Sequence, residues 1–280
     1  MDATSALPLF TAGAAASDVR VRDSLAGSTF TDAAQALVAG PGCVAGPPVA
    51  CSANGVDARL SAHADRFRYH GSHLAKVTAG GGDDHVLASG DRNDVRGGAG
   101  GDDIWINGNG PSTAAGGSGK DRIYGTELPV NLAGGGDADL VYGDSGVFNR
   151  ISGNDGDDTL VGGAGSPRSG GGTVSGSAGK DVIVVLGHDW TISGGRGNDL
   201  IRGGPDVETI TAGDGADRVD VRDGVQDAVS CGAGVDVAYA DPIDTVAADC
   251  ETVSARPAPD LPALERALAR AAKLKAAFGT

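Results

Sequence analysis

Short apolar segments recur between clusters of Gly and Asp over residues 79–240. Within each segment apolar and polar residues alternate, which is the period of a β-strand with one buried face. The same inward place carries a branched aliphatic residue in eight of nine segments, and Ala238 holds it in the ninth. The eight residues are Val86, Ile104, Ile123, Val141, Leu160, Ile183, Ile201 and Val219. The pattern predicts many short strands joined by turns.

The nine segments are copies of one nine-residue motif, in which glycines are followed by Asp at the sixth place. Two examples are GGAGGDDIW from Gly97 and GGSGKDRIY from Gly116. The motif starts are separated by 18, 19, 18, 19, 23, 18, 18 and 19 residues. The sixth-place residues are Asp84, Asp102, Asp121, Asp139, Asp158, Asp181, Asp199, Asp217 and Asp236. Such a period predicts a solenoid in which each coil contacts only its neighbours.

Degenerate half-coils lie between the motifs, among them GTELPVNLA from Gly125 and GGPDVETIT from Gly203. They keep an inward aliphatic place, at Val95, Leu132, Ile151, Ile192, Ile210 and Val229. Each coil of 18–19 residues is therefore predicted to contribute two strands and two turns, with the nine motifs on one edge.

Composition supports a turn that demands glycine. The 280 residues include 48 Gly but only 5 Phe, 4 Tyr, 2 Trp and 1 Met. So much Gly weakens helices and strands unless the backbone needs positive φ at many places. The net charge of −15 disfavours nucleic acid and anionic membranes as partners and favours hard cations. No segment has the length and hydropathy of a membrane span.

Gly and Asp at these places suit calcium. Ca²⁺ takes six to eight oxygen ligands, and Gly lets the backbone direct several carbonyl groups inward while one Asp adds charge. The predicted ligand set is the nine sixth-place Asp residues together with the second- and fourth-place glycines of the motifs. These glycines are Gly80, Gly82, Gly98, Gly100, Gly117, Gly119, Gly135, Gly156, Gly179, Gly195, Gly197, Gly213, Gly215, Gly232 and Gly234.

The nine motifs resemble the G-G-x-G-x-D nonapeptide of the repeats-in-toxin (RTX, hemolysin-type) calcium-binding family over about residues 79–240. The resemblance implies an all-β, right-handed parallel β-roll with calcium between neighbouring turns. Nine turns leave about eight gaps, so about eight ions are expected, mostly along one edge. At most a few ions are expected on the opposite edge, at Asp94, Asp206 or Asp227.

Four cysteines form two local pairs, Cys43 with Cys51 and Cys231 with Cys250. The pairing favours disulfides and an oxidising, extracellular location; zinc is the alternative. The latter pair falls in a segment that looks like the closing coil of some family members.

The flanks divide the chain into further parts. Residues 1–16 are interpreted as a flexible N-terminus or the remnant of a signal peptide. Residues 17–78 are predicted to be an N-terminal β cap with degenerate coils, or alternatively a separate small β-domain, before a roll over 79–253. Residues 254–280 are predicted to be a Pro-rich linker and a basic helix over 261–278, either a capping helix or a docking element.

No HExxH or GxSxG motif is present, so a protease or lipase of those types is not predicted. The sequence favours a non-catalytic, secreted protein that folds on binding Ca²⁺ and has a scaffold or adhesive role. Cell-envelope or extracellular polymers are candidate partners, and the open ends of the roll favour self-association. The alternative is a β-helix lyase or epimerase acting on extracellular polysaccharide.

Overall fold

The computed structural model describes the strand residues 9–11, 18–24, 27–32, 43–44 and 49–51, then 55–126, 129–144, 149–164, 171–187, 189–255 and 261–278. Side chains are described within 56–255, with the same gaps, and over 262–277.

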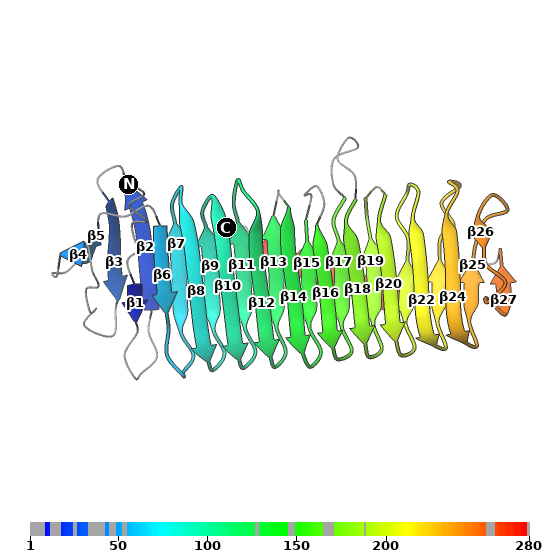
Figure 1. The fold of residues 1–280 in the computed structure, drawn as a ribbon, viewed down its shortest axis with the longest axis horizontal. Coiled ribbons are helices and arrows are strands. Elements are labelled where there is room, and N and C mark those ends of the chain that lie inside the picture. The colour runs from blue at the N-terminus through cyan, green and yellow to red at the C-terminus, as the bar shows by residue number, and fades with distance from the viewer. Residues whose placement is uncertain are drawn as a thin grey trace, which may run out of the picture.

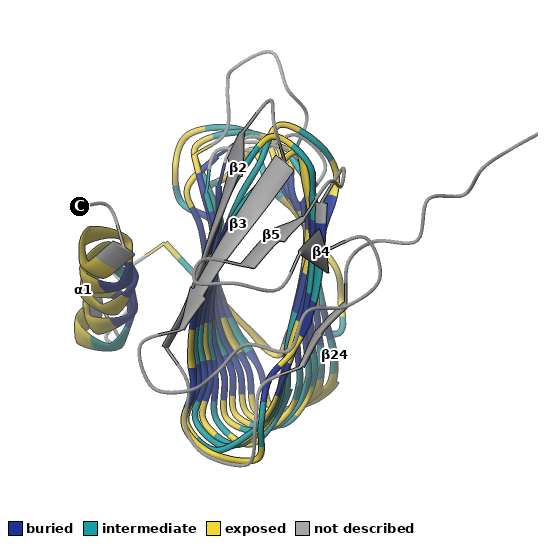
Figure 2. Cartoon of the chain, turned by 90° about the vertical axis from the view of Figure 1, so that its left-hand side faces the viewer, coloured by how far each residue is buried: buried dark blue, intermediate teal, exposed yellow. Residues whose placement is uncertain are grey.

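The described strands form two long sheets that face each other, and the chain alternates between them (Figures 1 and 2). Sheet A contains, in order, β1 (Leu9–Thr11), β6 (Gly55–Arg59), β8 (Leu74–Gly81), β10 (Arg92–Ala99), β12 (Ser112–Ser118), β14 (Val130–Gly136), β16 (Arg150–Asp155), β18 (Thr173–Ala178), β20 (Thr191–Arg196), β22 (Thr209–Gly215), β24 (Ala228–Gly234) and β26 (Thr245–Val246).

Sheet B contains the alternate strands. In order they are β27 (Thr252–Ser254), β25 (Val237–Tyr239), β23 (Arg218–Asp220), β21 (Leu200–Arg202), β19 (Val182–Val185), β17 (Thr159–Gly162), β15 (Leu140–Gly143), β13 (Arg122–Thr126), β11 (Asp103–Asn107), β9 (His85–Ser89), β7 (Arg66–His70), β2 (Asp18–Ser24), β3 (Gly27–Asp32), β5 (Val49–Cys51) and β4 (Cys43–Val44).

Strand pairing follows the repeat of the sequence. Ile104 lies opposite Val86 and Ile123 in parallel register, at separations of one coil. The longest interval between motifs also keeps register, since Leu160 pairs with Ile183. The predicted parallel β-solenoid with coils of 18–19 residues is confirmed.

The core is a thin layer between the two sheets. All nine eighth-place residues, from Val86 to Ala238, are fully buried, as are the predicted inward residues of the half-coils, from Val95 to Val229. They form one continuous cluster. Parallel strands buried on an inner face in this way make two aliphatic rows along the roll, one from each sheet.

The N-terminal strands join the same two sheets. β1 pairs in parallel with β6, and β2 pairs in parallel with β7. β3 then turns back antiparallel to β2, and β5 and β4 follow antiparallel, with Cys43 opposite Cys51. The predicted Cys43–Cys51 disulfide lies outside the described side chains, and the proposed domain boundaries remain predictions.

The helix α1 (Leu261–Phe278) begins and ends where the sequence predicts. It lies along the outer face of sheet B, beside the middle of the roll (Figure 2). Ala271 and Leu274 contact Tyr124, Tyr142 and Val161, and a neighbouring cluster joins Leu264 and Ala267 to Val184 and Leu200. Because the helix covers them, the strands from β13 to β19 lose the buried–exposed alternation that β9 and β11 keep.

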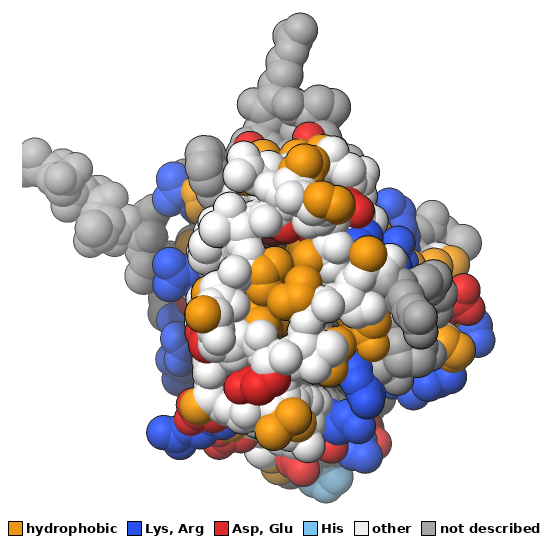
Figure 3. All heavy atoms as spheres, turned by 90° about the vertical axis from the view of Figure 1, so that its right-hand side faces the viewer, with side chains coloured by type: hydrophobic (Ala, Val, Ile, Leu, Met, Phe, Trp, Pro, Cys, Tyr) orange, Lys and Arg blue, Asp and Glu red, His pale blue; other side chains and the backbone are white. Residues whose placement is uncertain are grey.

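The C-terminal end of the roll is closed by a disulfide between Cys231 and Cys250, whose Cα atoms lie 5.1 Å apart. Here the thiols are joined to each other, so they are not zinc ligands. Apolar side chains show at the middle of this end (Figure 3). The helix that the structure describes is not long and apolar enough to cross a membrane.

Candidate metal centre: a ladder of buried carboxylates

The motif turns all sit at one edge of the roll and share one backbone conformation. All fifteen second- and fourth-place glycines predicted from the sequence have positive φ, from 90° at Gly82 to 156° at Gly234. Where a motif lacks one of them, Asp137, Asn154 and Ser177 take positive φ instead. Glycine adopts this region at no steric cost, so the turn geometry explains why the motif repeats Gly at these two places.

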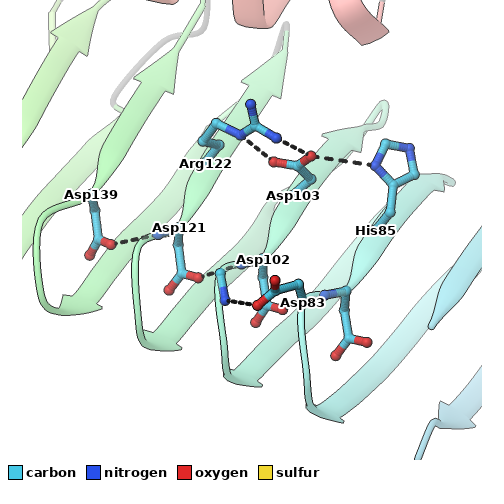
Figure 4. Close-up of polar contacts among 9 residues, drawn as sticks. Asp83, His85, Asp102, Asp103, Asp121, Arg122 and Asp139 are labelled. Carbon is cyan, nitrogen blue, oxygen red and sulfur yellow. Dashed lines mark hydrogen bonds and ion pairs between the residues drawn. The ribbon is translucent and has the colours of Figure 1, made fainter. Parts of the chain in front are cut away.

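The sixth-place Asp side chains form a row that runs from coil to coil (Figure 4). The N–H of Asp84 donates to Oδ1 of Asp102, and the N–H of Asp102 donates to Oδ1 of Asp121, both at 2.8 Å. The same bond recurs through the nine motifs. At the last coil Glu251 replaces Asp and accepts from the N–H of Asp236. We call this row, from Asp84 to Asp236, the carboxylate ladder.

The second oxygen of every ladder residue is buried without a partner. Each ladder Asp is at most 3 % exposed. Among the described residues, Oδ2 of all nine makes no hydrogen bond. A buried carboxylate oxygen left in this state is costly, so nine in a row indicate a ligand that the protein atoms alone do not supply.

First-place glycines border these oxygens. A Cβ added to Gly97 would overlap Oδ2 of Asp102 and lie 2.6 Å from the carbonyl oxygen of Gly116 in the next coil. The six motifs that begin with Gly share this arrangement around Oδ2, at Gly97, Gly116, Gly134, Gly153, Gly176 and Gly194. The sequence analysis did not assign a role to these glycines, although their place in the motif was a visible signal. Because these glycines have no side chain, the carboxylate oxygen and the carbonyl oxygen of the next coil can approach each other closely.

Burial changes the acidity of the ladder. It raises the pKa of Asp84, Asp121, Asp139, Asp158 and Asp181 to about 7, and that of Asp102, Asp199 and Asp217 to about 6. Hydrogen bonds from the backbone oppose this shift, and neighbouring carboxylates add to it. Without a cation, the folded ladder therefore resists full ionisation near neutral pH.

The ligand atoms at the ladder are all oxygen, and they combine carboxylates with carbonyl groups. Hard cations of the calcium type prefer this set, whereas zinc and copper prefer nitrogen and sulfur ligands. A cation between coils would partner the buried Oδ2 atoms and offset the repulsion among the carboxylates. The residues present therefore fit Ca²⁺.

The predicted second-edge residues have different surroundings. Asp94 is half-buried and accepts a hydrogen bond from the hydroxyl of Thr113. Asp206 is also half-buried, whereas Asp227 is 1 % exposed and lies near Glu208 and Asp223. The structure therefore does not bring the three together, and Asp227 has acidic neighbours that the sequence analysis missed.

A cavity of about 670 Å³ lies between α1 and the motif turns. Its lining combines the basic side chains of Lys120, Arg122, Arg270 and Lys273 with the carboxylates of Asp103, Asp121, Asp139 and Asp157. Arg122 forms an ion pair with Asp103, which also contacts His85 (Figure 4). The helix therefore gathers basic side chains that the sequence spreads over distant positions.

Together the parallel coils and the Gly/Asp turns define a calcium-binding β-roll. Residues 76–105, 106–127, 115–147, 148–166 and 191–220 match the family model of the RTX calcium-binding nonapeptide repeat. The chain thus carries RTX repeats and folds as a hemolysin-type β-roll, as the motifs predicted. Comparison with curated proteins found no match, and comparison with solved structures found none either.

Proposed function

We propose that the protein is a secreted structural module whose roll forms when Ca²⁺ occupies the carboxylate ladder. The observation that carries the proposal is the row of nine buried Oδ2 atoms without hydrogen bonds among the described residues. The aliphatic core is thin, and the chain is rich in glycine, whose ordering costs the most backbone entropy. Metal binding then supplies free energy that the core lacks.

The expected number of ions is about eight, one for each interval between consecutive motifs. Six intervals follow a first-place glycine, from Gly97 to Gly194, and bring the carboxylate oxygen of the motif close to that glycine. The first and last intervals follow Ala79 and Ala212, which place a methyl group there. We therefore propose six tighter sites flanked by two weaker ones.

A location outside the cell is proposed from two features. The Cys231–Cys250 disulfide suits an oxidising compartment, where calcium is also abundant enough to fill weak sites. The chain has a net negative charge, and the roll repeats one surface along its length. Both features suit a scaffold or adhesive role toward cell-envelope or extracellular polymers.

Far-UV circular dichroism of EDTA-treated protein, titrated with Ca²⁺ and in parallel with Mg²⁺, tests the proposal. A cooperative gain of β signal with Ca²⁺ alone is expected. A full β signal in the metal-free protein at neutral pH, unchanged by Ca²⁺, contradicts calcium-dependent folding.

The cavity under α1 favours a second candidate, a lyase or epimerase acting on acidic polysaccharide, because basic side chains and carboxylates line it together. Lys120, Arg270 and Lys273 would bind uronate carboxylates there, and the nearby calcium ladder would add a cation surface. Incubation with polyuronates tests this candidate by following unsaturated products in the ultraviolet or inverted sugars by NMR. An Arg270→Ala/Lys273→Ala variant that still folds with Ca²⁺ is the control; equal turnover by both proteins excludes this cavity.

A further inference from the structure

A second group of carboxylates lies at the edge opposite the ladder, near the C-terminal end of the roll. Glu208, Asp223 and Asp227 each offer one oxygen, and these oxygens lie within 4.8 Å of one another. Glu208 directly precedes β22 and Asp227 directly precedes β24, whereas Asp223 comes from the turn between β23 and β24. Two successive coils therefore bring three acidic side chains to one point, although none belongs to a Gly/Asp motif.

Two of these side chains are buried with one oxygen free. Glu208 is 0 % exposed and Asp227 is 1 % exposed. Oε2 of Glu208 accepts the N–H of Gly204 at 3.1 Å, and Oδ1 of Asp227 accepts the N–H of Glu208 at 2.7 Å. Within the described part of the chain, Oε1 of Glu208 and Oδ2 of Asp227 make no hydrogen bond. Each carboxylate is thus held by one oxygen and offers the other.

The space around Glu208 is bordered by backbone oxygen. A Cβ added to Gly204 would overlap the carbonyl oxygen of Gly187 and lie 3.1 Å from Oε1 of Glu208. A Cβ added to Gly203 would lie 3.1 Å from Oε2. The two glycines therefore let the Glu208 carboxylate and a backbone carbonyl oxygen lie close together with no side chain between them.

The surrounding charge is acidic. Asp244 accepts the N–H of Asp227 at 3.0 Å, and Arg222, which precedes Asp223 in the chain, is ion-paired with Asp220 at 2.9 Å. Burial, together with the charges of Asp227 and Asp223, raises the pKa of Glu208 to about 8. Carboxylates buried together without a cation repel one another and lose hydration, which a bound divalent ion would reverse.

We propose that Glu208, Asp223 and Asp227 bind one Ca²⁺ ion at the edge opposite the ladder. The three carboxylates and the nearby carbonyl groups form an all-oxygen set, which is the preference of calcium. The ion would join the coil of β22 to the coil of β24, just before the disulfide-closed end. The site extends the proposed calcium binding to the second edge and requires only that the roll is folded.

Trp190 provides a local probe of this site. The carbonyl of Trp190 accepts the N–H of Thr209, the residue after Glu208, so the indole belongs to the adjacent coil. The chain has two tryptophans, and a Trp105→Phe background leaves Trp190 alone. Terbium, which takes calcium sites, is added to this variant in its folded form, and tryptophan-sensitised emission is recorded before and after displacement with Ca²⁺.

Strong emission is expected in the Trp105→Phe protein, and loss of that emission is expected when Glu208→Gln and Asp227→Asn are added. The calcium stoichiometry from equilibrium dialysis should fall by one ion. An Asp102→Asn control should lose a ladder ion and keep the emission. If the Glu208→Gln/Asp227→Asn protein has an altered circular dichroism spectrum, Asp223→Asn replaces it as the test, because Asp223 is exposed. This variant should need a higher terbium concentration for the same emission.

The proposal is overturned if emission and stoichiometry are unchanged in the Glu208→Gln/Asp227→Asn protein. If that double variant misfolds, unchanged values in Asp223→Asn overturn it instead. Failure of the proposed calcium-dependent folding is detected separately, by a circular dichroism β signal that does not depend on Ca²⁺. In that case the folded roll would still show terbium emission if this site binds metal, so the two proposals can fail independently.

Discussion

The backbone N–H of Asp121 donates a 2.8 Å hydrogen bond to Oδ1 of Asp139, one coil further along the roll. The bond fixes the direction of the Asp139 carboxylate. Its Oδ2 then lies buried with no hydrogen bond among the described residues. Each coil therefore orients the carboxylate of the following coil, which is the proposed calcium ligand.

First-place and third-place glycines of the same motif should respond differently to alanine. A Cβ at Gly134 would overlap Oδ2 of Asp139, whereas a Cβ at Gly136 would have no atom nearer than 3.9 Å. Gly134→Ala should lose one Ca²⁺ and destabilise the calcium-loaded roll by about 1–3 kcal/mol, the usual cost of overpacking. Gly136→Ala should change neither the ion count from equilibrium dialysis nor the thermal midpoint. Equal behaviour of the two variants would contradict a role of the first-place glycine in the proposed calcium site.

Asp121→Asn should have opposite effects with and without calcium. The Asn side-chain oxygen can still accept the N–H of Asp102, but the buried charge is removed. In EDTA at pH 8 the variant should be more stable than the parent by about 1–3 kcal/mol, because Asn has no charge to bury beside the neighbouring carboxylates. In saturating Ca²⁺ it should be less stable, because a charged ligand is lost. Thermal unfolding followed by circular dichroism measures both; a variant less stable in EDTA would argue against a strained metal-free ladder.

The metal-free roll should lose stability as pH rises. Burial raises the folded-state pKa of ladder residues such as Asp139 to about 7, whereas the ordinary value is 3.8. Between these values the folded state binds more protons than the unfolded state, so the free energy of unfolding falls with increasing pH. EDTA-treated protein should therefore show more β signal at pH 5 than at pH 8, and Ca²⁺ should remove most of the difference. A metal-free signal that grows with pH would contradict the burial of these carboxyl groups.

The docking of α1 should depend on one helix face. Leu274 is 5 % exposed and contacts the aromatic residues of sheet B, whereas Ala272 is exposed. Leu274→Asp should cost the docked helix about 2–5 kcal/mol or more, the range for losing a buried leucine, while the roll stays folded with Ca²⁺. Limited proteolysis should then release the helix, and a dye that binds apolar surface should bind over Tyr124 and Tyr142. Ala272→Asp should leave both readouts unchanged.

The sequence predicted most of the roll because its geometry repeats. Ile104 and Ile123 occupy one place of the motif, and that shared place set the strand period, the inward face and the coil-to-coil register. The Gly residues with positive φ were equally predictable, since no other residue suits that backbone region as well.

Other features depend on contacts between distant segments, which periodicity does not encode. The helix position follows from apolar ninth-place residues such as Trp105 and Tyr142. These residues are visible in the motifs, but the sequence does not distinguish a helix-covered position from an ordinary strand position. Asp223 lies in a turn outside every repeat place, so its approach to Glu208 emerges only when two coils are stacked. The antiparallel turn of β3 onto β2 likewise has no counterpart in the repeats.

The hydrogen bond between successive ladder residues also makes the length of the protein adjustable. Each rung joins only adjacent coils, and the two ends are closed by residues outside the ladder, Asp65 and Glu251. Deleting residues 116–133, one whole coil, would place the motif of Gly134 directly after that of Gly97, with the N–H of Asp102 facing Asp139. The roll can therefore grow or shrink by unit coils with both ends preserved, and each coil would add or remove one proposed calcium site.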